Sequence, residues 1–489
     1  MSAFTSPVVD PQALPNLASS AGDPSGQGAH VETPILISSI TGGTLFRFAT
    51  AGSVDDGKST LVGRLLHDSK AILADTLDAV TRTSADRGFG GEGGGGQKID
   101  LALLTDGLRA EREQGITIDV AYRYFATDRR SFILADCPGH VQYTRNTVTG
   151  ASTADAVVVL IDARKGVLEQ TRRHLSVLRL LRVPNVVVAV NKIDLVDFSE
   201  AAFRAIEADV QSVAGQIGVA DVLVVPVSAL EGDNVVTRSA HTGWYTGPSL
   251  LDILETLPTT DEVERGLEPF RFPVQLVVRP QGALAPELSN ADDAGASFRD
   301  YRAYAGQVAS GSVAVGDEIT VLPSGTKASV TAIDFAGRPL ERAVAPQSVS
   351  LRLSEEIDIA RGDVIAASGT FGEVSQDLYA ELCWLSAKPL REGAKVLIKH
   401  GSKTVQGLIR AVTGKLDLET FELGAASGLE LNDIGTAQIR LASALPIESY
   451  ALHRRTGAFL VIDPQDGNTL AAGLVRDHPG DHEDERYVI

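Results

Sequence analysis

The segment GSVDDGKS, from Gly52 to Ser59, constrains the fold of this chain more than any other stretch of it. It satisfies the pattern G-x-x-x-x-G-K-[ST], with an apolar run before it and an amphipathic helical pattern after it. In such a loop the glycines let successive backbone N–H groups turn inward around a phosphate, and the positive N-terminal end of the following helix adds to the attraction. The segment therefore predicts a phosphate-binding loop, in which Lys58 reaches the β- and γ-phosphates and the Ser59 hydroxyl binds Mg²⁺.

The whole of this loop is predicted to bind the nucleotide. The carboxylates of Asp55 and Asp56 carry the same sign of charge as a triphosphate and would repel it. We therefore expect these carboxylates to hydrogen-bond loop amides or to point outward, and we favour this interpretation for Asp56. The predicted nucleotide-binding residues of the loop are Gly52, Ser53, Val54, Asp55, Asp56, Gly57, Lys58 and Ser59.

From about residue 44 to residue 260, apolar runs alternate with helical patterns. Several of the runs are unbroken Val, Ile and Leu, as central strands covered on both faces require. The β-α-β order implies parallel pairing, but only a few polar residues, Thr127 to Arg130, join the second and third runs, which predicts an antiparallel hairpin there. The expected strands lie within 44–52, 118–127, 130–139, 154–166, 185–196 and 220–230, and the expected helices within 58–69, 170–182, 199–218 and 248–257.

Beyond residue 268 the sequence changes to short alternating segments separated by Gly and Pro, which is typical of β-barrels. A second set of such segments begins near Asp377. The predicted fold class is therefore an α/β P-loop domain with a mixed, mostly parallel sheet, followed by two β-barrel domains. We expect a disordered N-terminal tail over residues 1–43, a nucleotide-binding domain over 44–262, and barrels over 268–376 and 377–485. The glycine-rich insert at 88–97 is expected to be a mobile loop.

The segment DCPGH, residues 136–140, ends the third expected strand. Asp136 can hold Mg²⁺ through a water molecule, and the Gly139 amide can donate to a γ-phosphate. His140 is the candidate to orient the attacking water, with an ordinary packing or capping role as the alternative. Cys137 is most simply a small buried side chain. The predicted nucleotide-binding residues here are Asp136, Cys137, Pro138, Gly139 and His140.

Two further segments indicate which base is bound. The carboxylate of Asp194, in NKID, can accept two hydrogen bonds from the N1–H and the 2-amino group of guanine, and adenine lacks both donors. A backbone amide of the segment SAL can read the guanine oxygen. Both segments follow strands, at the edge of the sheet where such folds bind ligands. The predicted base-binding residues are Asn191, Lys192, Ile193, Asp194, Ser228, Ala229 and Leu230. Residues 44–262 are therefore predicted to form a GTP-binding G domain, an α/β P-loop GTPase domain.

The segment AEREQGITID, residues 110–119, precedes the second expected strand. Thr117 is placed to complete the Mg²⁺ shell and to sense the γ-phosphate, so this segment should order with GTP and relax with GDP. A threonine before a strand is otherwise an ordinary β-branched residue. The predicted metal ligands are thus Ser59, Thr117 and Asp136, and the predicted catalytic residues are His140, Lys58 and Thr117.

The composition limits the setting of this site. A net charge of −19 disfavours a nucleic acid partner, although a local basic patch could override it. No apolar run approaches the ~20 residues of a membrane helix, so no membrane association is expected. The first 30 residues lack Lys and Arg, unlike a secretory signal. With only two cysteines, far apart, the chain fits a reducing cytoplasm.

The motifs EREQGIT, D-x-PGH and NKID with two following barrels resemble elongation factor Tu and the translational GTPases. A closer resemblance, over the G domain and into the last barrel, is to the large GTPase subunit of ATP-dependent sulfate adenylyltransferase. It rests on the segments GSVDDGKSTLVGRLLHDSK, QKIDLALLTDGLRAEREQGITIDVAYRYF, PGHVQYTRN, LIDARKGVLEQTRRH, VAVNKIDLVD, SALEGDNV and TGAFLVIDP. Ser53, Cys137 and the stretch NTVTG depart from the expected pattern without removing a group assigned to chemistry.

The resemblance implies that GTP hydrolysis is coupled to the transfer of AMP from ATP to sulfate, at the head of sulfate assimilation. The sequence shows one nucleotide site and no second P-loop, so a fused adenosine phosphosulfate kinase is not expected. The ATP and sulfate chemistry is expected on a separate small catalytic subunit, which is the expected partner. The alternatives are a translational GTPase that delivers aminoacyl-tRNA and a regulatory GTPase without coupled chemistry. The segment KGVLEQTRRH, with Arg172, Arg173 and His174, is either a partner contact or a solvated helix N-terminus.

Overall fold

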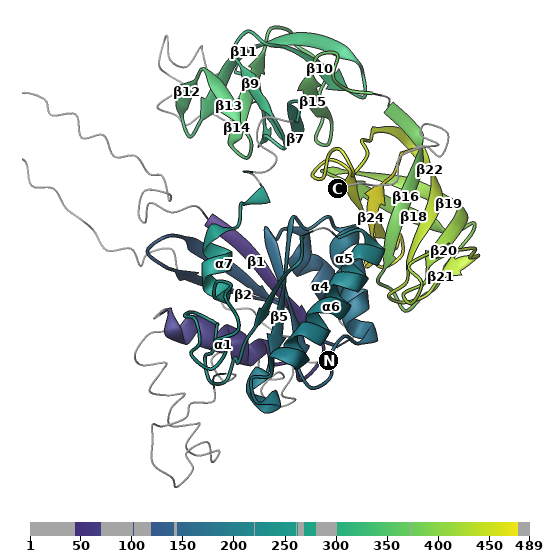
Figure 1. The fold of residues 1–489 in the computed structure, drawn as a ribbon. Helices are drawn as coiled ribbons and strands as arrows, with labels where there is room; N and C mark the ends of the chain where they lie inside the picture. The colour runs from purple at the N-terminus through teal and green to yellow at the C-terminus, as the bar shows by residue number, and fades with distance from the viewer. Residues whose placement is uncertain are drawn as a thin grey trace, which may run out of the picture.

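The computed structural model of the chain describes residues 45–69, 101, 119–140, 144–219, 221–260, 262, 268–279, 301–372 and 374–477. The N-terminal tail, the glycine-rich insert and Thr117 lie outside these residues. The described part folds into a G domain followed by two barrels; in Figure 1 the first barrel lies above the G domain and the second to its right, beside α5. Within it, no helix has the length and apolar character that crossing a membrane requires.

The G domain is built on a six-stranded sheet with the order β2-β3-β1-β4-β5-β6. All neighbours are parallel except β2 and β3, which form the predicted antiparallel hairpin. The strands are β1 (Leu45–Gly52), β2 (Ala121–Ala126), β3 (Ser131–Asp136), β4 (Ala156–Asp162), β5 (Asn185–Asn191) and β6 (Leu223–Pro226). The helices are α1 (Lys58–Asp68), α4 (Thr144–Ser152), α5 (Glu169–Leu180), the 3-10 helix η4 (Ile193–Val196), α6 (Glu200–Ile217) and α7 (Leu250–Thr256).

Two apolar cores cover the two faces of this sheet. Along β4, Val157 and Val159 pack with the core of α4, α5 and α6, whereas Val158 and Leu160 pack with the core of α1 and α7. Side chains alternate between faces along a strand, so a strand buried on both sides needs apolar residues throughout, as the unbroken runs predicted. Helix α4 was not predicted, because its sequence TRNTVTGAS holds few strong helix formers.

Two closed barrels of antiparallel strands follow, as predicted. In the first, β10-β15-β7-β8-β14-β11 is closed by the pairing of β10 with β11, and in the second, β18-β23-β24-β16-β22-β19 is closed by β18 with β19. The first barrel and its short additions comprise β7 (Arg271–Val278), β8 (Ala303–Gln307), β9 (Ser312–Ala314), β10 (Glu318–Leu322), β11 (Thr326–Phe335), β12 (Arg338–Leu340), β13 (Arg342–Val344), β14 (Ser348–Leu353) and β15 (Val364–Ala367). The second comprises β16 (Val374–Trp384), β17 (Leu390–Arg391), β18 (Lys395–His400), β19 (Lys403–Leu416), β20 (Leu423–Gly424), β21 (Gly428–Leu429), β22 (Ile434–Pro446), β23 (Ala458–Ile462) and β24 (Thr469–Val475).

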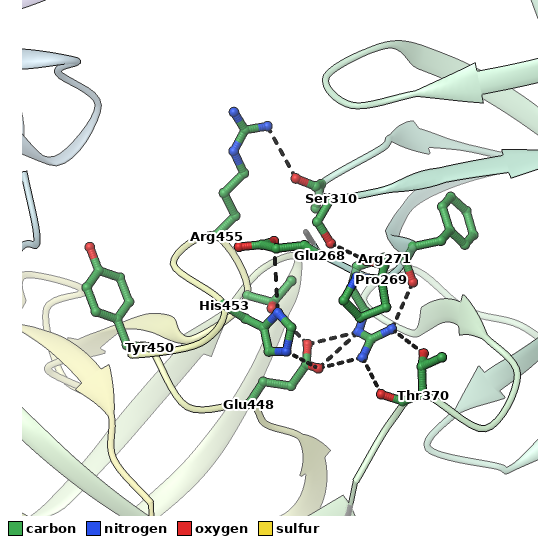
Figure 2. Close-up of polar contacts among 12 residues, drawn as sticks. Glu268, Pro269, Arg271, Ser310, Thr370, Glu448, Tyr450, His453 and Arg455 are labelled. Carbon is green, nitrogen blue, oxygen red and sulfur yellow. Dashed lines mark hydrogen bonds and ion pairs between the residues drawn. The ribbon is translucent and has the colours of Figure 1, made fainter. Parts of the chain in front are cut away.

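The two barrels are joined by a buried ionic cluster (Figure 2). Arg271, on β7, has a fully buried side chain that donates to both carboxylate oxygens of Glu448 in the second barrel, at 2.7–3.0 Å. Its remaining donors reach the Thr370 hydroxyl, the Thr370 carbonyl and the Phe270 carbonyl. His453 Nε2 lies 3.4 Å from Glu448, and His453 Nδ1 lies 3.9 Å from Glu268. We call these five residues the barrel junction.

The G domain contacts the second barrel through α5. One apolar core continues from the α5 and α6 face of the G domain to Cys383, Ile434 and Leu474 of the barrel. The Tyr450 hydroxyl donates to the Leu181 carbonyl at 2.7 Å. These contacts place the helix that flanks the nucleotide loop directly against the barrel.

Candidate nucleotide site

The predicted phosphate-binding loop connects β1 to α1 and closes on itself. Gly57 is the N-cap of α1 and has a φ of 93°, in the left-handed region that favours glycine. A Cβ at Gly57 would lie 2.4 Å from Asn191 Nδ2, so a side chain there would displace Asn191. The buried Lys58 ammonium donates to the carbonyls of Gly52 and Ser53, at 2.9 and 2.8 Å. Burial lowers the pKa of Lys58, which the nearby carboxylates of the site oppose.

Asp56 occupies the interior of the loop, as we favoured from the sequence. Its side chain is buried, and Oδ2 accepts a hydrogen bond from the Ser53 amide at 2.7 Å. Burial raises the pKa of Asp56, although the Ser53 amide and the Lys58 charge act in the opposite direction. The neighbouring Asp55 is exposed, with a φ of 66°. One carboxylate therefore orders the loop backbone, and the other faces solvent.

The end of β3 lies against this loop. The Thr50 hydroxyl donates to Asp136 Oδ1 at 2.8 Å, and Asp136 is buried. A Cβ at Gly139 would lie 2.3 Å from Lys58 Nζ and 2.7 Å from the Gly52 carbonyl oxygen, so the chain passes directly over the lysine. The next residue, His140, is exposed. The structure thus brings Asp136, Gly139 and Lys58 to one place, with His140 at its outer rim.

Cys137 and Pro138, between Asp136 and Gly139, are buried. A Cβ on Gly150 of α4 would lie 2.4 Å from Cys137 Sγ, so the thiol packs closely against that helix. Burial raises the pKa of the Cys137 thiol. The prediction of a small buried side chain is confirmed.

Asn191 connects the phosphate loop to both base-binding segments. Its Nδ2 donates to the Asp56 carbonyl at 2.7 Å, and its Oδ1 accepts from the Ala229 amide at 2.9 Å. The Ile193 amide donates to the Val227 carbonyl at 3.3 Å, which joins the two base-binding segments a second time. Ser228 and Ala229 are buried, Asp194 is half-buried, and Leu230 is exposed. The loop, NKID and SAL therefore form one hydrogen-bonded edge of the sheet.

Two sets of contacts that sequence reasoning missed support this edge: ion pairs of Asp162 and hydrogen bonds of Arg64. The buried carboxylate of Asp162, at the end of β4, pairs with Arg164 at 2.7 Å and with Lys192 at 3.0 Å. Burial alone would raise the pKa of Asp162, but the hydrogen bonds from Arg164 and Lys192 outweigh it and hold this pKa well below its usual range. Arg64, on α1, donates to the Ala229 carbonyl at 3.1 Å and to the Leu230 carbonyl. The segment LIDARKG carried a signal for the first contact, since its acidic and basic residues directly follow a strand.

His174 corrects one interpretation. The sequence left it as a partner contact or part of a solvated helix end, but its side chain is 2% exposed. The ring hydrogen-bonds the backbone of Gly52 and lies 3.3 Å from Gln170 Nε2. Burial, followed by the nearby Lys58 charge, lowers the pKa of His174 to about 3. Both interpretations are wrong for this residue. It is a buried residue that hydrogen-bonds the first residue of the nucleotide loop.

The donors gathered here fit Mg²⁺. The Ser59 hydroxyl and the Asp136 carboxylate provide hard oxygen ligands, which this ion prefers. Ser59 is half-buried in the first turn of α1, beside Lys58. The third predicted ligand, Thr117, lies outside the described residues.

Comparison with known proteins agrees with this architecture. The family described as elongation factor Tu GTP binding domain matches residues 44–260, and the family described as GTP-eEF1A C-terminal domain-like matches residues 377–476. The first match covers the strands and loops that build the site, so a GTPase domain is present.

Longer matches cover most of the chain. Sulfate adenylyltransferase subunit 1 of Cellvibrio japonicus is 47% identical over 431 residues, which are 88% of this chain and 86% of the relative. The protein of the same name from Alteromonas mediterranea is 46% identical over 433 residues, 88% of this chain and 87% of the relative. The bifunctional enzyme CysN/CysC of Mycobacterium tuberculosis is 47% identical over 434 residues, 88% of this chain and 67% of that protein. This chain therefore belongs to the family of sulfate adenylyltransferase subunit 1.

Proposed function

We propose that this chain is the GTP-hydrolysing subunit of a two-subunit sulfate adenylyltransferase. In this proposal, GTP hydrolysis on the G domain is coupled to the reaction of ATP with sulfate, which gives adenosine 5′-phosphosulfate and pyrophosphate. The observation that carries the proposal is the Asn191 side chain, which ties the phosphate loop to the base-binding segments in a chain of this family. A site that joins these three loops is organised for one whole guanine nucleotide.

Guanine selection is assigned to Asp194. Its carboxylate can accept hydrogen bonds from both the N1–H and the 2-amino group of the base, and charged hydrogen bonds of this kind are among the strong ones. Lys192 adopts a left-handed backbone conformation, with a φ of 62°, and pairs with Asp162. This pairing holds Lys192, and Asp194 lies in the first turn of the 3-10 helix η4 that follows. In this proposal, Asp194 meets the base from the start of that short helix.

Phosphate and metal binding are assigned to the first half of the site. An ammonium has three donors, and Lys58 gives two of them to loop carbonyls, so one donor is available to the β- and γ-phosphates. Ser59, Asp136 and Thr117 are the proposed Mg²⁺ ligands. When bound, the ion neutralises charge on the phosphate oxygens. The burial of Lys58 strengthens its attraction to these oxygens, because the local dielectric is low.

His140 is the proposed water-orienting residue. It follows Gly139, which lies over Lys58, and its exposure lets its ring reach a water molecule beyond the γ-phosphate. We further propose that the segment with Thr117 and the loop after Gly139 change shape when the γ-phosphate leaves. These changes would carry the energy of hydrolysis to the partner subunit.

The adenylyl transfer site is proposed to lie on a separate small subunit, and the complex is proposed to work in the cytoplasm. Adenylation of sulfate is unfavourable by itself, which gives a physical reason for a second nucleotide. A translational role, with aminoacyl-tRNA as ligand, is the competing function. The long matches to sulfate adenylyltransferase subunit 1 favour the first function over the second.

Reconstitution tests the proposal. The chain alone should hydrolyse GTP slowly and form no phosphosulfate from ATP and sulfate. Addition of the small subunit should produce sulfate-dependent pyrophosphate release, and GTP should raise its rate or extent more than GDP or a non-hydrolysable GTP analogue. Absence of phosphosulfate under every condition, with GTP-dependent binding of aminoacyl-tRNA, would overturn the proposal in favour of translation.

A further inference from the structure

Two neighbouring cavities lie between the G domain and the second barrel, and their walls include residues of α5, β16 and β24. Figure 1 shows the second barrel beside α5. Their volumes are about 130 and about 210 Å³, and both are lined by Arg179, Glu381 and Leu423. Because they share these three residues, we treat them as one site and call it the α5–barrel cavity. Its α5 wall is formed by residues of the C-terminal half of that helix, among them Ser176 and Arg179, and the cavity does not include the nucleotide site.

The charged groups of this cavity are poorly satisfied by the protein itself. Arg179 comes from α5, Glu381 from β16, and Arg476 from the residue after β24. Within the residues that the structure describes, none of the three side chains has a hydrogen bond or an ion pair within 4 Å. Arg182, on the same wall, differs, since it donates to the carbonyls of Tyr450 and Ala451. Arg182 therefore joins the G domain to the second barrel, whereas the other three charged groups can still pair with a ligand.

All three residues are half-buried, so each charge is partly shielded from water and has no protein partner that replaces the lost solvation. Burial raises the pKa of Glu381, and Arg476 and Arg179 oppose this shift. The charges of both guanidiniums therefore act on the Glu381 carboxylate, although neither guanidinium contacts it. A ligand that pairs with all three groups would replace the lost solvation.

The arrangement selects a particular class of ligand. A simple anion would be attracted by Arg179 and Arg476 but repelled by Glu381, and a simple cation would meet the reverse. A zwitterion can place its carboxylate on the guanidiniums and its ammonium on the carboxylate. The rest of the wall is largely apolar and includes Leu180 and Leu474.

We propose that the α5–barrel cavity binds a free α-amino acid with an apolar side chain. The ligand carboxylate pairs with Arg179 and Arg476, its ammonium pairs with Glu381, and its side chain packs against the leucines. Such a ligand touches α5 of the G domain and two strands of the barrel at once, so it stabilises their contact. This inference does not rest on the proposed function, because it concerns binding at a separate site.

Titration calorimetry on the full chain, with L-leucine as the probe, tests the inference. Two half-ligands of the same shape separate the charges: 3-methylbutylamine keeps only the ammonium, and 4-methylpentanoate keeps only the carboxylate. We expect L-leucine to bind and each half-ligand to bind at least tenfold more weakly. We set a dissociation constant of about 10 mM as the weakest affinity that would support the inference. Absence of L-leucine binding at this concentration would overturn it. The inference also fails if a half-ligand or sulfate binds as tightly as L-leucine.

Variants locate the binding. Glu381→Gln and Arg179→Met should each weaken L-leucine binding at least tenfold, and Arg476→Gln serves as a second test of the guanidinium pair. Arg204→Met is the matched control, because Arg204 is an exposed arginine on α6 that pairs with Glu200 and Glu207. Since the cavity charges have no protein partners, their removal should not lower the melting temperature. Unchanged leucine binding in folded Glu381→Gln and Arg179→Met chains would overturn the assignment.

Discussion

The nucleotide site and the barrel junction both hold buried charges, but they satisfy them differently. At the junction, Arg271 gives its donors to Glu448, Thr370 and the Phe270 carbonyl, so the protein completes the set by itself. At the nucleotide site, Lys58 rests on two backbone carbonyls, which are weaker partners than a phosphate. The first arrangement stabilises one geometry, and the second is ready to exchange its partners for a ligand.

The largest effect is expected at Asp194. In Asp194→Asn the side-chain amide presents a donor to the guanine donors, and loss of two charged hydrogen bonds of roughly 1.5–3 kcal/mol each should weaken GTP at least a hundredfold. Xanthosine triphosphate, which presents an acceptor there, should bind better than to the parent chain. Equilibrium binding of both nucleotides measures this.

Asp197→Asn is the control, since Asp197 is an exposed carboxylate three residues further along. Its nucleotide affinity should not change. If Asp194→Asn binds GTP as tightly as the parent chain, Asp194 does not recognise the base.

The barrel junction should respond next most strongly, in stability and not in GTP affinity. Arg271→Met leaves Glu448 buried without its main partner, and breaking a buried pair in this way costs roughly 3–5 kcal/mol. The double variant Arg271→Met/Glu448→Leu should recover most of the loss, because it removes both charges. Urea unfolding of the single and double variants measures this, and a double variant as unstable as the single one would contradict the account.

His174 provides a test by pH. Its folded-state pKa of about 3 lies below its ordinary value of 6.5, so the unfolded chain binds a proton that the folded chain does not. Its contribution to stability is therefore complete above pH 6.5 and is lost as the pH falls from 6.5 toward 3, at up to about 1.4 kcal/mol per pH unit.

In His174→Gln this part of the acid sensitivity should disappear. Unfolding midpoints at pH 7 and pH 5 measure the difference between parent and variant. His67→Gln is the control, since His67 is a partly exposed histidine on α1. An equal acid loss in the parent and in His174→Gln would show that this histidine is not buried as a neutral ring.

The smallest effect in free energy is expected at His140. His140→Ala should bind GTP and Mg²⁺ nearly as the parent does, while turnover falls about tenfold or more, or about 1.4 kcal/mol of barrier. Ser59→Ala should instead weaken Mg²⁺-dependent binding. Nucleotide binding and single-turnover hydrolysis separate these outcomes, and an equal loss of affinity in both variants would make His140 structural.

The sequence predicted the two regions unequally, for a physical reason. The phosphate loop, DCPGH and NKID are contiguous motifs, because a loop at the end of a strand carries its chemistry within a few residues. The contact between Arg271 and Glu448 joins positions 177 residues apart, so no local pattern reveals it. Asn191 is an intermediate case. The motif NKID identified this residue as part of the site, but only the fold shows that its side chain links Asp56 to Ala229.

Contacts between distant parts of the chain also explain why helix α4 and the burial of His174 were not predicted. Helix α4 forms from TRNTVTGAS because Thr147 and Val148 are buried, and tertiary packing outweighs weak helix propensity. His174 lies in a segment rich in charge, which favoured a solvated helix end. Its burial depends on the approach of α5 to Gly52, which sequence spacing does not encode.

The central claim is that hydrolysis on this G domain supports adenylyl transfer on a partner. The most direct measurement is the number of phosphosulfate molecules formed per GTP hydrolysed, in the reconstituted pair with the parent chain and with His140→Ala. We expect the variant, although loaded with GTP, to form less phosphosulfate in proportion to its lower GTP turnover. Undiminished phosphosulfate formation by a variant that hydrolyses almost no GTP would contradict it.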